Sequence, residues 1–218
     1  MLRQFSAPGR IEISGNHTDH QNGHVLAAAV NMETLCEAEP NNDSIIHIRS
    51  KGYEPIEIDL SDTTARDTEK HTSAALVRGV ADWLRSRDYC IGGFDGVVST
   101  SIPVGFGLSA SASFEVLIGR VIKGLYDDNI SSIDIAIAGQ YAENNYYGKP
   151  CGLMDQLASS LGGCMHIDLI KPERPVITGV NAGLPGYKIC VVNTGAGHAD
   201  LTDEYAAVTD EKIGRAHV

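Results

Sequence analysis

The sequence predicts an α+β fold in which a mixed sheet packs against helices. Short segments with the alternating pattern of strands occur in groups, for example at residues 45–49 and 56–60, with turn residues between them. Longer segments with helical spacing of apolar residues, such as residues 72–87, lie between these groups. Because the strands and helices are mixed and do not alternate strictly as βαβ units, the pattern favours α+β.

The other expected elements follow in chain order. Further strands are expected at residues 11–14, 25–30, 97–102, 164–169 and 187–192. Further helices are expected directly after residues 103–113, over about 132–146, from near Gly152 and from Leu201. No internal repeat or low-complexity linker divides the chain.

Composition and charge exclude several classes of protein. The chain has 218 residues, is 43% hydrophobic and carries a net charge of −11 without a basic run, which argues against nucleic-acid binding. Its five cysteines form no Cys-x-x-Cys pair and show no metal-site spacing, so we expect reduced thiols. The N-terminus lacks an apolar signal region, and no apolar stretch approaches the length of a membrane span. We therefore expect a cytoplasmic protein with no membrane partner.

The most informative segment is Pro-Val-Gly-Phe-Gly-Leu-Ser-Ala-Ser-Ala-Ser at residues 103–113. It joins a predicted strand to a predicted helix through two glycines and small hydroxyl residues. The first N–H groups of a helix have no internal partner and carry the positive end of its dipole, so an anion could bind here. An ordinary serine N-cap after a glycine turn is the alternative interpretation.

Two other segments concentrate polar side chains. Residues 7–23 place Arg10, Asn16, His17 and Asp19 in a glycine-bounded loop, which suits a ligand with many hydroxyl groups. A solvated loop would explain the same pattern. Asp155 lies in the first turn of a predicted helix, after glycine and proline residues. The alternative interpretation is an acidic residue that has no other role and is stabilised there by the helix dipole.

Together, the three segments resemble the motifs of the galactokinase family, within the GHMP small-molecule kinases. Residues 7–23 resemble the signature Gly-Arg followed by Gly-x-His-Thr-Asp, and residues 103–113 resemble the ATP motif Pro-x-x-x-Gly-Leu-Ser-x-Ser-Ala-Ser. Residues 151–156 resemble the family segment Cys-Gly-x-Met-Asp-Gln. The motifs run in family order and with family-like spacing over residues 7–160. The resemblance implies a GHMP kinase N-terminal domain with the ribosomal protein S5 domain 2-like fold.

The resemblance implies a catalytic pair and a sugar site. Asp155 would take or orient the proton of the anomeric hydroxyl of the sugar. Arg10 would lie beside it, keep the carboxylate ionised and offset charge on the transferring phosphoryl group. The sugar hydroxyls would be bound by Asn16, His17 and Asp19, with the backbone of Gly152 lining the same pocket.

The resemblance also implies ATP and Mg²⁺ as cofactors. Ser111 and Glu143 match the serine and glutamate that the family associates with Mg²⁺. The ATP phosphates would be bound by Gly105, Gly107, Leu108, Ser109, Ala110, Ser111, Ala112 and Ser113. Phosphoryl transfer mainly needs alignment and charge neutralisation, which these groups could supply.

The implied activity is the ATP-dependent phosphorylation of D-galactose at its anomeric hydroxyl. Two positions depart from the family pattern, because Asn16 stands where glutamate is usual and His20 where tyrosine or phenylalanine is usual. Asn16 loses a charge-assisted hydrogen bond to a hydroxyl. A kinase for another hexose or an N-acetylated amino sugar, and a sugar- and ATP-sensing regulator without useful catalysis, therefore remain alternatives.

The resemblance also predicts the domain organisation. Residues 1–212 would form the N-terminal, sugar- and ATP-binding domain, and residues 213–218 (Ile-Gly-Arg-Ala-His-Val) would be a non-native tail that resembles a translated sequencing adapter. The family's C-terminal domain, which closes the active-site cleft, has no counterpart in these 218 residues. We therefore expect the chain alone to lack kinase turnover and to expose an apolar face.

Overall fold

The computed structural model describes residues 1–16, 18–103, 105–183 and 185–192. Its strands are β1 (Arg3–Ser14), β2 (His24–Pro40), β3 (Ile45–Ser50), β4 (Ile56–Asp59), β5 (Phe94–Thr100), β6 (Cys164–Asp168) and β7 (Val176–Gly179). Its α-helices are α1 (Ser73–Ser86), α2 (Ala110–Tyr126), α3 (Ser132–Ala142) and α4 (Met154–Leu161). Three short helices complete it: the 3₁₀ helices η1 (Thr18–Gln21) and η2 (Asp67–Glu69), and the π-helix η3 (Glu143–Tyr147).

All seven strands form one mixed sheet, in the order β4-β3-β5-β2-β6-β7, with β1 paired to β2 outside this path. The pairing of β3 with β5 is parallel, whereas the other pairings are antiparallel. Strand β2 is the centre of the sheet, because its first half pairs with β6 and its second half pairs with β5. The α+β class and the mixed sheet expected from the sequence are confirmed.

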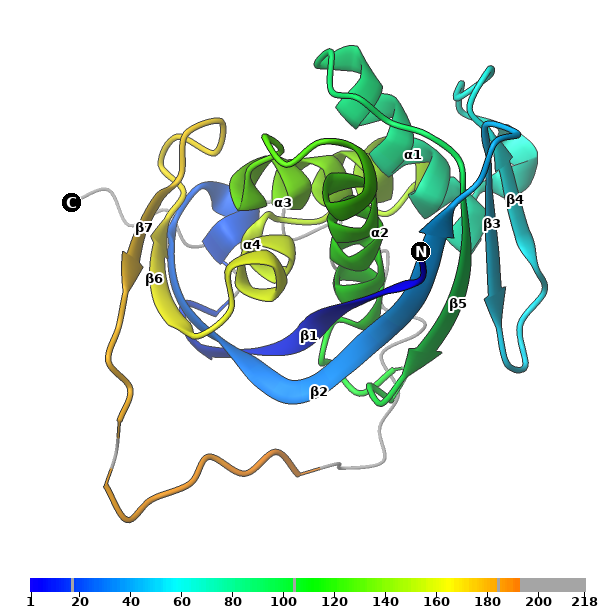
Figure 1. The fold of residues 1–218 in the computed structure, drawn as a ribbon. Helices are drawn as coiled ribbons and strands as arrows, with labels where there is room; N and C mark the ends of the chain where they lie inside the picture. Colours follow the sequence, from blue (N-terminus) through cyan, green and yellow to red (C-terminus); the bar gives the residue numbers. More distant parts are fainter. Residues whose placement is uncertain (17, 104, 184, 193–218) are drawn as a thin grey trace.

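The four α-helices lie on the concave side of the curved sheet (Figure 1). Helix α2 packs against β1 and β2, and α3 packs against α1, α2 and α4. The apolar core has two parts. The larger one includes Phe94 of β5 and Leu117 of α2, and the smaller one includes Val25 of β2 and Leu157 of α4. Helix α4 is therefore fixed between the sheet and α3 by the smaller core.

An irregularity in β1 brings the strand to the loop before α2. The register of β1 on β2 shifts between Pro8 and Arg10, where proline has no N–H to donate to a strand partner. Gly9 lies so close to the loop that a Cβ there would come within 2.8 Å of the carbonyl oxygen of Leu108. The N–H of Arg10 donates to that same oxygen at 3.2 Å. The bulge therefore places Arg10 beside the predicted phosphate-binding segment.

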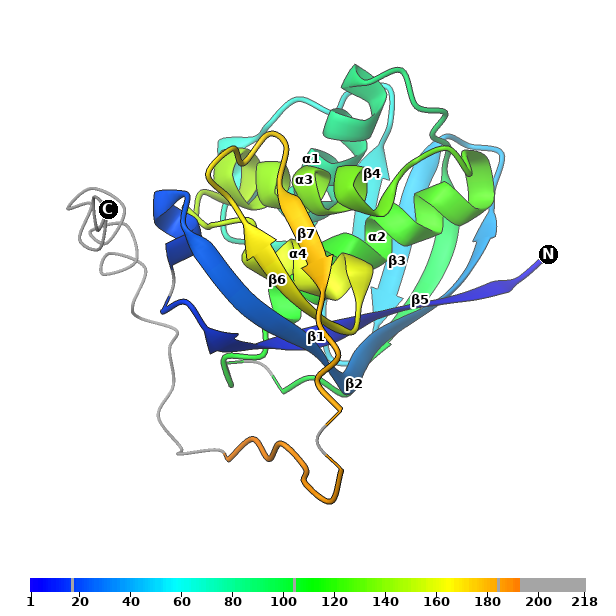
Figure 2. The ribbon, with the colours of Figure 1, turned by 90° about the vertical axis from the view of Figure 1, so that its left-hand side faces the viewer.

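The structure departs from the expected elements in several places, among them the greater lengths of β1 and β2. The helix expected to reach residue 146 is α-helical only to Ala142 and continues as η3 to Tyr147, and the next residue, Gly148, has a φ of 88°. The strand β7 was not expected. Residues 187–192 do not form the expected strand: they run away from the sheet (Figures 1 and 2), where Tyr187 is 80% exposed and Val192 is 79% exposed.

Two expectations concern residues outside the described part of the chain, namely the helix from Leu201 and the tail at 213–218. Within the described part, no helix combines the length and the apolar character needed to cross a membrane.

Candidate active site

The side chains of Arg10 in β1 and Asp155 in the first turn of α4 form a bidentate ion pair. The Nε of Arg10 donates to Oδ1 of Asp155 at 2.6 Å, and Nη2 donates to Oδ2 at 2.7 Å. The remaining Nη1 donates to the carbonyl oxygen of Gly107 at 2.6 Å. One guanidinium therefore connects the carboxylate to the glycine turn before α2, and its planar fork fixes the orientation of both.

The carboxylate of Asp155 is held in its ionised form. Burial alone would raise its pKa, but the charge and hydrogen bonds of Arg10, with the hydroxyl of Ser109, hold the pKa below its usual range. The side chain of Asp155 keeps 28% of its surface exposed, against 11% for that of Arg10. An ionised carboxylate that a small molecule can reach can accept or orient a hydroxyl proton.

Three residues of the loop before α2 have a left-handed backbone conformation. Gly105 and Gly107 have φ values of 80° and 71°, in the left-handed region where glycine has no steric cost. Ser109 also lies there, with φ and ψ both at 56°, and its side chain does not cap α2. Its hydroxyl donates to Oδ2 of Asp155 instead. The first turn of α2 therefore lacks the serine cap that was the alternative interpretation.

The residues of the predicted ATP motif divide into two groups. The exposed or half-buried group could face a ligand, and it consists of Gly105, Gly107, Ser109, Ala110 and Ser111. The buried group consists of Leu108, Ala112 and Ser113. The hydroxyl of Ser113 contacts the carbonyl oxygen of Ala7 at 2.7 Å and the hydroxyl of Thr34 at 2.9 Å. The side chain of Ser113 therefore anchors α2 to the sheet and does not point toward a phosphate group.

The predicted metal-binding residues lie together at the start of α2 and of η3. The hydroxyl of Ser111 is 3.4 Å from Oε1 of Glu143, and Nζ of Lys149 is 3.3 Å from the same oxygen. Burial alone would lower the pKa of Lys149, but the Glu143 carboxylate raises it above its usual value. A carboxylate and a hydroxyl are hard oxygen ligands, and Mg²⁺ usually binds one or two carboxylates together with substrate phosphates. The two residues therefore fit Mg²⁺ beside a phosphate chain.

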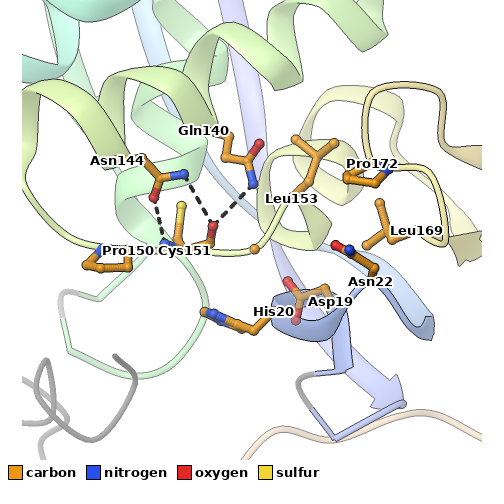
Figure 3. A pocket seen from close by; sticks show the side chains of 11 residues that line it. Asp19, His20, Asn22, Gln140, Asn144, Pro150, Cys151, Leu153, Leu169 and Pro172 are labelled. Atoms are coloured by element: carbon orange, nitrogen blue, oxygen red, sulfur yellow. Dashed lines mark hydrogen bonds between the residues drawn. The ribbon is translucent and has the colours of Figure 1, made fainter. Parts of the chain in front are cut away.

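A cavity of about 370 Å³ opens beside the first turn of α4 (Figure 3). Polar side chains from η1, α3 and η3 form one part of its wall, and apolar residues form the other. The lining residues are Asp19, His20, Asn22, Gln140, Asn144, Pro150, Cys151, Gly152, Leu153, Leu169 and Pro172. Carboxylate, amide and imidazole groups along an apolar wall match the mixed character of a sugar.

The predicted sugar-binding residues have different positions. Asp19 is buried, lines the cavity, and accepts a hydrogen bond of 3.4 Å from the N–H of Met154. Gly152 lies so close that a Cβ on it would meet Oδ2 of Asp19 at 2.0 Å. Asn16 does not line the cavity; it is exposed, with a φ of 54°. His17 lies outside the described residues.

Sequence reasoning missed the amides that hold the loop between η3 and α4. Nε2 of Gln140 donates to the carbonyl oxygen of Cys151 at 3.2 Å. Oδ1 of Asn144 accepts from the N–H of Cys151 at 2.7 Å (Figure 3). The four-residue spacing of Gln140 and Asn144 puts them on one helical face, which was the available signal. Burial, more than any other cause, raises the pKa of the Cys151 thiol well above its usual range, so this thiol stays neutral.

Comparisons with known proteins agree with this geometry. Residues 75–163 match the family model of the GHMP kinases N terminal domain, and residues 3–40 match the galactokinase galactose-binding signature. The galactokinase of Lactococcus lactis, solved in complex with galactose, is 25% identical, with a TM-score of 0.78. That match covers 96% of this chain and 55% of the galactokinase.

Two more distant structures share the fold. The mevalonate kinase of Methanococcus jannaschii is 16% identical with a TM-score of 0.65, over 84% of this chain and 56% of that one. The D-glycero-D-manno-heptose 1-phosphate kinase of Bacteroides thetaiotaomicron is 19% identical with a TM-score of 0.66, over 83% and 60%. The chain thus spans a little over half the length of these structures. It contains the N-terminal domain of a GHMP kinase and carries the galactose-binding signature of galactokinases.

Proposed function

We propose that the protein to which this chain belongs transfers the terminal phosphoryl group of ATP to the anomeric hydroxyl of D-galactose. The products would be galactose 1-phosphate and ADP. The observation that carries this proposal is the ion pair of Arg10 and Asp155, which lies between the glycine turn and the first turn of α4. The galactose-binding signature at residues 3–40 supports galactose as the acceptor.

The two members of the pair would act on the two reactants. The ionised carboxylate of Asp155 would accept the proton of the anomeric hydroxyl, or orient that hydroxyl for in-line attack. Arg10 already contacts Gly107, so its positive charge lies where a phosphate chain on this turn would pass. It would offset the negative charge that develops on the phosphoryl oxygens.

The start of α2 would bind the phosphates of ATP. Its first N–H groups are not capped by Ser109, and the exposed Gly105 and Gly107 present no side chain that blocks a close approach. Ser111 and Glu143 would hold Mg²⁺, which when bound neutralises phosphate charge and orients the chain of phosphates. Glu143 would keep its position through the contact with Lys149.

The cavity at α4 would bind the sugar. Asp19 and Gly152 both line it, and they lie next to each other. Sugar hydroxyls would donate to the Asp19 carboxylate and hydrogen-bond with Asn22 and His20, and these bonds would discriminate between epimers, because a buried polar group without its partner hydroxyl is costly.

The test is ADP release by the whole protein with ATP, Mg²⁺ and a panel of hexoses and N-acetylated amino sugars. We expect turnover selective for galactose that is lost in Asp155→Ala but kept in Asp95→Ala, an exposed carboxylate on β5. Turnover on another sugar would support kinase activity but with a substrate other than galactose. Binding of ATP and galactose without turnover would favour a regulator.

A second arm tests the 218-residue chain by itself. We expect it to show no turnover, because the chain spans 55% of the length of the Lactococcus lactis enzyme. ADP release at the rate of the whole protein would show that these residues suffice.

A further inference from the structure

Gln156, the residue after Asp155 in α4, joins two acidic side chains inside the domain. Its Nε2 donates to Oε2 of Glu115 in α2 at 3.0 Å and to Oε2 of Glu143 in η3 at 3.0 Å. Gln156 and Glu115 have no exposed surface, and Glu143 has 3%. The described residues thus place one amide between two carboxyl groups from two other helices.

We propose that Gln156 is a positioning residue that holds the Glu143 carboxylate toward Ser111, and that Glu115 fixes the orientation of the Gln156 amide. The inference rests on the proposed function, in which Ser111 and Glu143 hold Mg²⁺ beside ATP. Gln156 itself would touch neither the metal nor a substrate.

The two hydrogen bonds fix the orientation of the Gln156 amide. A side-chain amide has two N–H donors, and here the same nitrogen contacts both acidic groups. Rotation of the amide by half a turn would place its oxygen against two acceptors and leave buried groups without donors, which is costly. Because Gln156 directly follows Asp155 in α4, the same short helix sets the positions of Asp155 and Glu143.

Close packing fixes the amide further. Gly139 of α3 lies over the contact, where an added Cβ would come within 3.0 Å of Oε2 of Glu115 and 3.1 Å of Cγ of Gln156. The absence of a side chain at this helical position lets α2, α3 and α4 approach around the amide. This also explains a glycine inside a helix, where glycine is less favourable than alanine.

Two atoms of the cluster point to the state of Glu115. Oε1 of Glu115 and Oε1 of Gln156 are buried acceptors without a hydrogen-bond partner among the described residues. Burial and the nearby Glu143 raise the pKa of Glu115 well above its usual range. A proton on Glu115 would supply the donor that an acid–amide pair needs.

The test is the Mg²⁺ dependence of ATP binding by the whole protein, measured by displacement of a fluorescent ATP analogue at increasing Mg²⁺. Gln156→Met keeps the length of the side chain and removes its donors. We expect it to raise the Mg²⁺ concentration at half-saturation about tenfold, the size expected for one lost hydrogen bond to a charged group. Glu115→Gln can still pair with Gln156 and should stay within twofold of the wild type.

Ser160→Ala is the matched control, because Ser160 lies in the same helix, is buried, and its hydroxyl donates to the carbonyl oxygen of Ser132. It should lower thermal stability without changing the Mg²⁺ dependence. Gly139→Ala is a milder second variant, in which gained helix propensity opposes the strain. It should raise the half-saturation concentration two- to threefold.

The proposal is overturned if Gln156→Met and Gly139→Ala lower stability but keep the wild-type Mg²⁺ dependence, as expected of a glutamine that only fills the core. It is also overturned if Glu115→Gln is as damaging as Gln156→Met. Failure of the proposed function is a separate result. If the wild type shows no sugar-dependent turnover, but the variants show the expected changes in the Mg²⁺ concentration at half-saturation, the result would support this inference alone.

Discussion

Ser109 donates its hydroxyl to the Asp155 carboxylate and so leaves the helix that it precedes without a side-chain cap. The contact is made from a left-handed backbone at Ser109, with a φ of 56°. For a residue other than glycine this conformation costs about 1–2 kcal/mol. Strain at this position is thus coupled to the placement of a hydrogen bond on the reactive carboxylate.

Two substitutions at Ser109 separate the strain from the hydrogen bond. Ser109→Ala and Ser109→Gly both remove the hydroxyl, so both should reduce turnover by about tenfold, as expected for one hydrogen bond to a charged group. Only glycine relieves the backbone strain, so Ser109→Gly should be more stable than Ser109→Ala by about 1 kcal/mol. Urea unfolding and steady-state kinetics measure the two effects, and equal stabilities would show that the backbone at 109 is unstrained.

The bidentate geometry of Arg10 should matter as much as its charge. Lysine keeps the charge but cannot make two parallel hydrogen bonds to Asp155 and a third to Gly107. We expect Arg10→Lys to reduce kcat at least a hundredfold, about 2.7 kcal/mol of transition-state stabilisation. Arg49→Lys, at an exposed position in β3, is the control and should leave kcat unchanged. A retained kcat in Arg10→Lys would mean that charge alone suffices.

The lowered pKa of Asp155 predicts a pH-dependent contribution to stability. A carboxylate whose pKa is lower in the folded state stabilises that state above its unfolded pKa of about 3.9. This stabilisation is lost as the pH falls through the folded-state pKa. The stability difference between the wild type and Asp155→Asn should therefore be largest near pH 5–8 and shrink below about pH 4. Ser160→Ala removes no titrating group, so the stability difference between the wild type and this variant should not shrink below pH 4.

Gly152 should tolerate no side chain, because a Cβ there would overlap Oδ2 of Asp19. Gly152→Ala must displace either the Asp19 carboxylate or the loop, at a cost of about 1–3 kcal/mol for overpacking. We expect a rise of about tenfold or more in KM for the sugar, with little change in KM for ATP. Gly179→Ala is the control, since no atom lies within 4 Å of a Cβ at that position. Equal effects on both values of KM would point to a general loss of folding.

Short segments with clear boundaries could be predicted closely from the sequence. The strands β3 and β4 and helix α1 agree with the expected ranges to within one residue, since turn residues delimit them. The lengths of β1 and β2 were underestimated, because pairing along both edges of β2 carries the strand through polar residues such as Thr34 and Glu37. Exposed apolar residues at 187–192 have the alternation of a strand but gain no ladder among the described residues.

The contacts within the site depend on tertiary structure. The motifs indicated Arg10, Asp19, Asp155 and Glu143 as functional candidates, and the structure brings Arg10 to Asp155 and Ser111 to Glu143. The motif pattern could not show that Ser113 faces the sheet while Ser109 faces the carboxylate. That distinction rests on the positions of Asp155, which accepts from the hydroxyl of Ser109, and of Ala7, which accepts from the hydroxyl of Ser113.

The π-helix at the end of α3 has a consequence for the register of the whole site. A π-turn contains about one residue more than an α-turn, so it acts as a one-residue insertion that shifts every later side chain around the helix axis. Glu143 and Asn144 lie inside this wider turn, whereas Gln140 precedes it. If the same five residues formed an α-turn instead, the residues after them would be rotated by about 100° around the helix axis. The alignment of the cavity wall with the reactive carboxylate thus depends on the number of residues in this turn as much as on their chemistry.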